Sequence, residues 1–71
     1  MTKGQVEVGQ VYAKIGERLP RQWRVVRLFD LPEGQHARLV RLDDPSRTIT
    51  LAADAVLDRR FMTLIADGTA S

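Results

Sequence analysis

Arginine is the side chain whose number and spacing most suggest chemistry in this sequence. Nine of the eleven basic residues are arginines, and Arg18, Arg21, Arg24 and Arg27 recur at every third position. A guanidinium group pairs with phosphate through two parallel hydrogen bonds, and an exposed aromatic ring beside it can stack on a base. The candidate nucleic-acid-binding residues are therefore Arg21, Arg24, Arg27, Arg38 and Trp23.

Whether these side chains meet depends on the strand that carries two of them. The segment 23–29 (WRVVRLF) is rich in β-branched and aromatic residues, which favours a strand. Arg24 and Arg27 fall on opposite faces of an ideal strand, and a β-bulge would correct this. With a bulge, we expect Arg21, Arg24 and Arg38 to form a basic patch beside Trp23. The competing interpretation is a solvated strand face, neutralised by nearby acidic residues, namely Glu17, Asp30 and Glu33.

Other chemistries find no support in the residue types. His36 is the single histidine and there is no cysteine, whereas a metal site needs three or four converging ligands. Asp43 and Asp44 precede Pro45, which is typical of a turn and not of a catalytic pair. Asp54 and Asp58 are expected to cap a helical turn. We predict a non-catalytic domain without metal or cofactor.

Four aromatic side chains are available to fill a core or to form a site. We expect Phe29 and Phe61 in the core, because a small domain needs its largest residues there. Trp23 suits either role. Tyr12 alternates with Val11 and Ala13 and is expected to face outward, so a Tyr12–Trp23 cage for a methylated amine is a further alternative.

Glycine, proline and other turn-forming residues divide the chain into short segments that recur about every ten residues. Alternating or β-rich segments predict strands at 10–15, 23–29, 36–42, 47–51 and 60–65. The composition of segments 30–34 and 43–46 predicts turns, and that of 16–22 predicts a long loop. The Ala-rich segment 52–58 favours one or two helical turns. One helix over 51–62 is the alternative for the last part. Five short strands predict an all-β fold that closes on itself to remove its edges.

This layout resembles the SH3-like barrel superfold. The resemblance covers about residues 8–65 and rests on Gly9 to Tyr12, the long first loop, Trp23 to Val26, two successive hairpins and the short turn before the last strand. The chain is also similar to small bacterial proteins of unassigned role, of KOW- or Tudor-like type. The resemblance implies a five-stranded barrel with one short helical turn before the last strand, acting as a binding module.

Length and charge complete the expectations. Seventy-one residues make one domain, with tails at 1–7 and 66–71 and the barrel at 8–65. No segment has the roughly 18 apolar residues that span a membrane, and no secretory signal is apparent, so we expect a cytoplasmic protein. Two hypotheses stay open: nucleic-acid binding through the arginines, or protein interaction by a monomer or weak homodimer through an open sheet edge.

Overall fold

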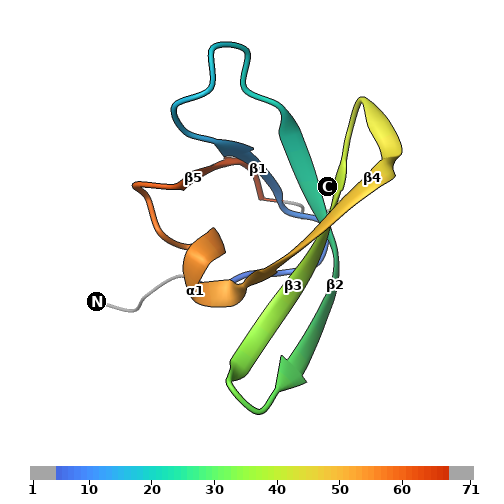
Figure 1. Cartoon of the computed structure of the whole chain (residues 1–71), viewed down its shortest axis with the longest axis vertical. Coiled ribbons are helices and arrows are strands. Elements are labelled where there is room, and N and C mark those ends of the chain that lie inside the picture. The colour runs from blue at the N-terminus through green and yellow to red at the C-terminus, as the bar shows by residue number, and fades with distance from the viewer. Residues whose placement is uncertain (1–4, 68–71) are drawn as a thin grey trace.

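Five strands and one short helix make up the computed structural model, which describes residues 5–67 (Figure 1). The predicted mostly-β content and the helical turn before the last strand are confirmed, and the alternative of one helix over 51–62 is wrong. Three strands are longer than expected because both hairpins are tight. The elements are β1 (Val11–Lys14), β2 (Gln22–Leu31), β3 (Gly34–Arg41), β4 (Asp44–Ala52), α1 (Ala53–Val56) and β5 (Met62–Ala66).

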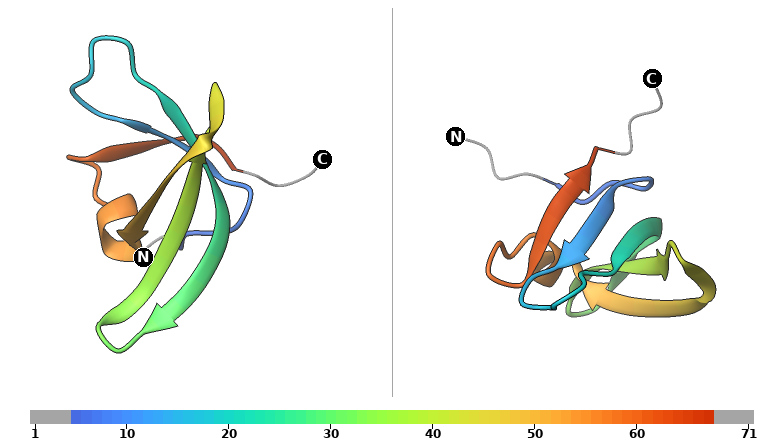
Figure 2. Two further views of the ribbon diagram at one scale, coloured as in Figure 1. Left: turned by 45° about the vertical axis from the view of Figure 1, so that its right-hand side comes forward. Right: turned by 90° about the horizontal axis from the view of Figure 1, so that it is seen from above.

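The strands form a single antiparallel sheet in the order β4-β3-β2-β1-β5. Figure 2 shows β1 and β5 lying at an angle to the β2–β3–β4 part, so that the sheet bends around its inner face, with α1 on that side. Within residues 5–67, β4 and β5 are edge strands that do not pair with each other. Closure into a barrel is therefore not confirmed.

The two hairpin turns follow the local turn chemistry. Leu31 pairs with Gly34 around Pro32 and Glu33, and Gly34 has a φ of 131°, which a side chain would strain. In the next hairpin the Asp44 carboxylate accepts hydrogen bonds from the Ser46 amide (3.3 Å) and hydroxyl (2.6 Å). These bonds, with help from neighbouring arginines, hold the pKa of Asp44 below its usual value.

The expected helix caps are wrong in detail. The residue before α1 is Ala52, which makes no side-chain capping bond, and Asp54 lies inside the first turn. Asp58 instead accepts hydrogen bonds from the backbone amide (2.9 Å) and guanidinium (3.2 Å) of Arg60, which fixes the turn into β5. The bonds from Arg60 lower the pKa of Asp58.

A small apolar core lies on the concave side of the sheet. Leu39 is fully buried and pairs across strands with Val25 and Ile49, so one row of the core crosses three strands. Met62 of β5 and Val56 of α1 close the core from the opposite side. The buried core cluster consists of Val6, Tyr12, Trp23, Val25, Ala37, Leu39, Ala53, Val56 and Met62.

Three aromatic placements differ from expectation. Tyr12 is buried, because it pairs with Trp23 and therefore shares the inner face. Its hydroxyl donates to Gln10 Oε1 (2.9 Å), and that oxygen also accepts from the Glu7 amide (2.8 Å). Phe29 lies only partly buried on the side of the sheet away from the core, and Phe61 is 40% exposed beside the core residue Met62. A Tyr12–Trp23 cage is excluded because both rings are buried in the core.

The chain ahead of β1 contributes to this core. Val6, within the segment expected to be a tail, is 3% exposed, and the backbone amide of Gly9 donates to Val25 (2.7 Å). The outermost residues of both expected tails, 1–4 and 68–71, lie outside the described residues. Among residues 5–67 no helix has the length and apolar character needed to cross a membrane.

Replacement of Leu39 by Ala is expected to remove most of the stability of the domain. Loss of a fully buried leucine costs about 2–5 kcal/mol, comparable to the whole stability of a domain of this size. Urea unfolding followed by Trp23 fluorescence measures the change. Leu19→Ala is the matched control, because Leu19 is 83% exposed and its loss should cost less than about 0.5 kcal/mol. Equal effects would contradict this core.

Tyr12 should make the fold sensitive to alkali. Burial raises the pKa of Tyr12, and the Glu7 carboxylate raises it further. The folded state then holds the phenol proton more tightly than the unfolded chain, so stability falls as the pH rises above about 10. Tyr12 is the only tyrosine, so tyrosinate absorbance reports it alone. In Tyr12→Phe the free energy of unfolding should fall less as the solution becomes alkaline. A titration midpoint of Tyr12 at or below 10 would contradict the buried phenol.

Candidate nucleic-acid interface

A β-bulge in β2 determines which side chains share a face. Val25 pairs with Leu39, but the next paired residue, Arg27, is opposite Arg38, so Val26 is the extra residue. Because an inserted residue shifts the alternation, Val25 and Leu28 both point to the core. Arg24 and Arg27 consequently both point to the opposite side of the sheet.

The pairing register places residues of β2, β3 and β4 on the same side of the sheet as Arg24 and Arg27. We call this side the outer face. Cross-strand partners share a face, and each core row alternates with an outer row. The outer face has three rows of three positions. They are Arg24, Val40 and Thr48; Arg27, Arg38 and Thr50; and Phe29, His36 and Ala52.

The outer face is cationic without compensation. Arg27 and Arg38 are directly opposite each other, an arrangement that destabilises a sheet. The nine outer-face positions include no acidic residue, and within residues 5–67 none of its three arginines makes an ion pair. Of the six other arginines, four pair with carboxylates over 2.6–3.9 Å, as for Arg41 with Asp43 and Arg60 with Asp58, and two, Arg18 and Arg59, make no ion pair within residues 5–67.

An aromatic pair adjoins the arginine row. The rings of Phe29 and His36 stack with centroids 6.1 Å apart at 28°. The Arg27 guanidinium carbon lies 5.6 Å from the Phe29 ring centroid, a cation–π distance. His36 Nδ1 donates to the Gly34 carbonyl (3.0 Å), which fixes the imidazole plane. The outer face thus combines guanidinium groups with two partly exposed rings.

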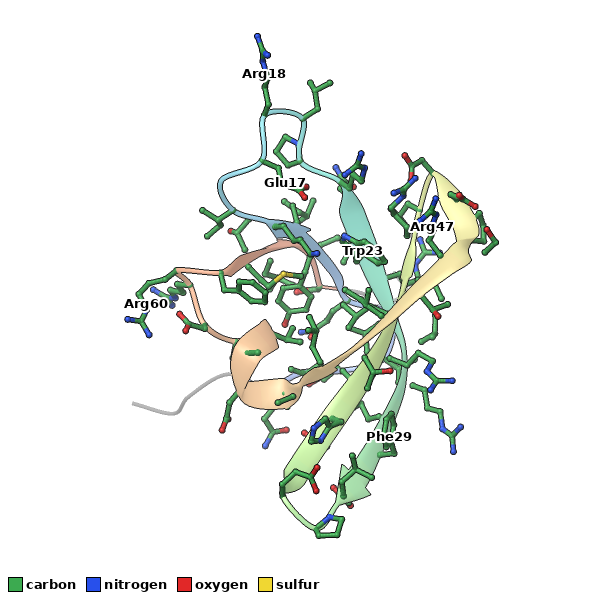
Figure 3. All side chains as sticks on the ribbon, in the orientation of Figure 1. Glu17, Arg18, Trp23, Phe29, Arg47 and Arg60 are labelled. Atoms are coloured by element: carbon green, nitrogen blue, oxygen red, sulfur yellow. The ribbon has the colours of Figure 1, made fainter. Side chains whose placement is uncertain are left out.

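The structure brings together three of the five predicted site residues. Arg24, Arg27 and Arg38 share the outer face, whereas Arg21 precedes β2 and pairs with Glu17 (3.9 Å). Trp23 is 6% exposed on the inner face, so it cannot stack on a ligand at the surface. Figure 3 shows Trp23 in the interior and Phe29 away from it on the β2–β3 hairpin, with Arg18, Arg47 and Arg60 at separate corners.

The two residues missed by sequence reasoning are Phe29 and His36. Phe29 was expected in the core because of its size, and His36 was considered only as a metal ligand without partners. The adjacent valines 25 and 26 were the available signal, because a bulge at Val26 moves Arg27 and Phe29 together to the face of Arg24. No property of the third strand alone identifies His36 as the neighbour of Phe29.

No metal-binding cluster accompanies the outer face in the same part of the chain. Residues 5–67 contain no group of three or more His, Asp or Glu side chains placed to hold a metal ion. Comparisons with protein-family models, with curated proteins and with solved structures found no match.

Replacing one arginine of the facing pair should stabilise the fold. Arg38→Thr removes the repulsion from Arg27 and adds a strand-forming residue, for a gain of about 0.2–1 kcal/mol. Arg24→Thr is the control, because its cross-strand partner is Val40. Thermal unfolding at low salt should rank Arg38→Thr above Arg24→Thr, and high salt should reduce the difference. A destabilised Arg38→Thr at low salt would contradict the like-charge pair.

Proposed function

We propose that this protein is a non-catalytic binding module that holds single-stranded nucleic acid on its outer face. Arg24, Arg27 and Arg38 contact successive phosphates, and the Phe29–His36 pair stacks on a base. The single observation that carries the proposal is the directly opposed pair Arg27 and Arg38, which no carboxylate among residues 5–67 neutralises. Phosphates bound by the two guanidinium groups would replace this repulsion with charge-assisted hydrogen bonds.

Single strands are favoured over duplexes by the rings. A base can stack on Phe29 or His36 only when it is free of its own stack, as in a single strand. Threonines of β4 on the same face, Thr48 and Thr50, supply hydroxyl groups that can donate to phosphate or sugar oxygens. Contacts of this kind carry no base specificity, so we expect binding to depend on strand form and salt more than on sequence.

We include in this proposal the SH3-like fold that the sequence resembles. The meander β1 to β4, the return of β5 to β1 and the helical turn before β5 support an SH3-like arrangement. Such a small bent sheet uses its interior for the core, so its surface is where ligands bind.

Fluorescence anisotropy with labelled 12-nucleotide single strands tests the proposal. Arg27→Gln/Arg38→Gln should bind at least about tenfold more weakly at 50 mM salt, equivalent to about 1.4 kcal/mol. With three phosphate contacts, a plot of the logarithm of the association constant against the logarithm of the salt concentration should have a slope of about −2 for the natural sequence. The double variant keeps one of these contacts, so its slope should be about −0.7. Duplexes of the same length should bind more weakly than single strands.

The matched control is Arg47→Gln/Arg60→Gln, which removes the same charge from arginines that pair with Asp44 and Asp58. It should bind nearly as well as the natural sequence. Absence of binding by the natural sequence at low salt, or equal losses in the two double variants, would overturn the proposal. Phe29→Leu should reduce the preference for single strands while leaving the salt slope unchanged.

A further inference from the structure

A cleft lies on the concave side of the sheet, beside the β5 edge. It has a volume of about 790 Å³ and is bounded by α1, β5 and the inner face of β1. Val56 and Met62 of the buried core form its apolar floor, and the more exposed Leu57 and Leu64 form its apolar walls. Small-molecule sites are typically clefts of about 300–1,000 Å³ with apolar walls and a few polar groups at fixed positions.

Gln10 places a side-chain amide group in this cleft. The residue lies directly before β1, is only 8% exposed and lines the cleft beside Tyr12. Its Oε1 accepts hydrogen bonds from the Tyr12 hydroxyl (2.9 Å) and the Glu7 amide (2.8 Å). Within residues 5–67 its Nε2 has no acceptor, yet protein atoms do not enclose this nitrogen as they enclose Trp23 Nε1. The amide nitrogen therefore opens onto the cleft.

The backbone holds Gln10 in this orientation. Its amide donates to the Glu7 carbonyl (3.2 Å), and its carbonyl accepts from the Val25 amide (2.8 Å). Together with the two bonds to Oε1, these bonds fix both the backbone and the side chain, so a ligand meets a donor that is already ordered. A nearly buried donor without an acceptor is unfavourable, and an acceptor atom brought by a ligand relieves it. The group that complements Gln10 is therefore a hydrogen-bond acceptor.

The charges around the cleft favour an uncharged acceptor. The Glu7 carboxylate lies close enough to the Tyr12 hydroxyl to raise the pKa of Tyr12, in addition to the effect of burial, and it disfavours a second negative charge at the same place. At the rim, the exposed Arg59 follows Asp58, which has the opposite charge. A cationic amine has no acceptor to offer the amide nitrogen. A neutral carbonyl oxygen meets the donor and avoids the repulsion.

We propose that this cleft binds a small neutral molecule with a carbonyl oxygen at the end of an unbranched apolar chain. The carbonyl accepts a hydrogen bond from Gln10 Nε2, and the chain lies against Val56, Met62 and Leu64. The cleft is on the inner side of the sheet at β1 and β5, whereas the outer face is on the opposite side of β2, β3 and β4. The inference is therefore independent of the nucleic-acid proposal.

Titration of the ¹⁵N-labelled natural sequence with hexanamide tests the site by nuclear magnetic resonance. The signals of the Gln10 side-chain amide and of the backbone amides of Leu57 and Leu64 should shift together, with the weak, about millimolar affinity of a small fragment. Hexanoate and hexylammonium have the same chain length and should each bind several-fold more weakly. An unshifted Gln10 side-chain amide at the solubility limit of hexanamide would overturn the proposal, as would equal binding of either charged probe.

Gln10→Glu isolates the contribution of the amide nitrogen. The carboxylate can still accept from Tyr12 and Glu7, but in its ionised form it has no donor for the ligand. Hexanamide should bind about tenfold more weakly to this variant, because its carbonyl loses the hydrogen bond and faces a carboxylate. Unchanged affinity for hexanamide would contradict the role of Gln10.

Leu64→Ala and Ile65→Ala form a matched pair that leaves Gln10 intact. The two residues are neighbours on β5 and are 47% and 49% exposed, but only Leu64 lines the cleft. Leu64→Ala should weaken hexanamide binding several-fold, and Ile65→Ala should leave it unchanged. Equal effects would overturn the proposal. This pair and the Gln10 signals of the natural sequence decide the question even if Gln10→Glu does not fold.

Discussion

The bulge at Val26 is the constraint on which the rest of the structure depends. A strand of regular alternation would place either Leu28 or Val25 on the solvent side, because they are three positions apart. The extra residue lets both reach the core, where they pair with Ala37 and Leu39. The same shift moves Arg27 to the face of Arg24. Core formation and clustering of positive charge are thus two consequences of one inserted residue.

The charged outer face is tolerated because the core opposite it is well formed. Leu39 and Val25 are fully buried under the row that carries Arg27 and Arg38, and burial of each apolar side chain stabilises the fold by about 1.5–3 kcal/mol. The repulsion of an exposed arginine pair is smaller, about 0.2–1 kcal/mol. The sheet can therefore keep a locally unfavourable pair at the surface, which is where a polyanion would relieve it.

Strand composition, turn residues and the need for a bulge near the two adjacent valines were predictable from the sequence. The burial of individual side chains was less predictable from the sequence. Tyr12 was misplaced because Val11, Tyr12 and Ala13 are all buried, so alternation in β1 does not distinguish the inner face. Phe29 and Phe61 were misplaced because size is a poor guide when Leu39 and Met62 already fill a small core. The pairing of Arg27 with Arg38 depends on register between strands, which local patterns do not contain.

The register around Val26 can be measured directly by nuclear Overhauser effects between backbone protons of β2 and β3. The account predicts cross-strand contacts of Val25 with Leu39, of Arg27 with Arg38 and of Leu28 with Ala37, with Val26 as the extra residue of the bulge. A continuous ladder, in which Val26 contacts Arg38 and Arg27 contacts Ala37, would contradict it. In that case Arg27 would point to the core side, and the basic outer face would not exist.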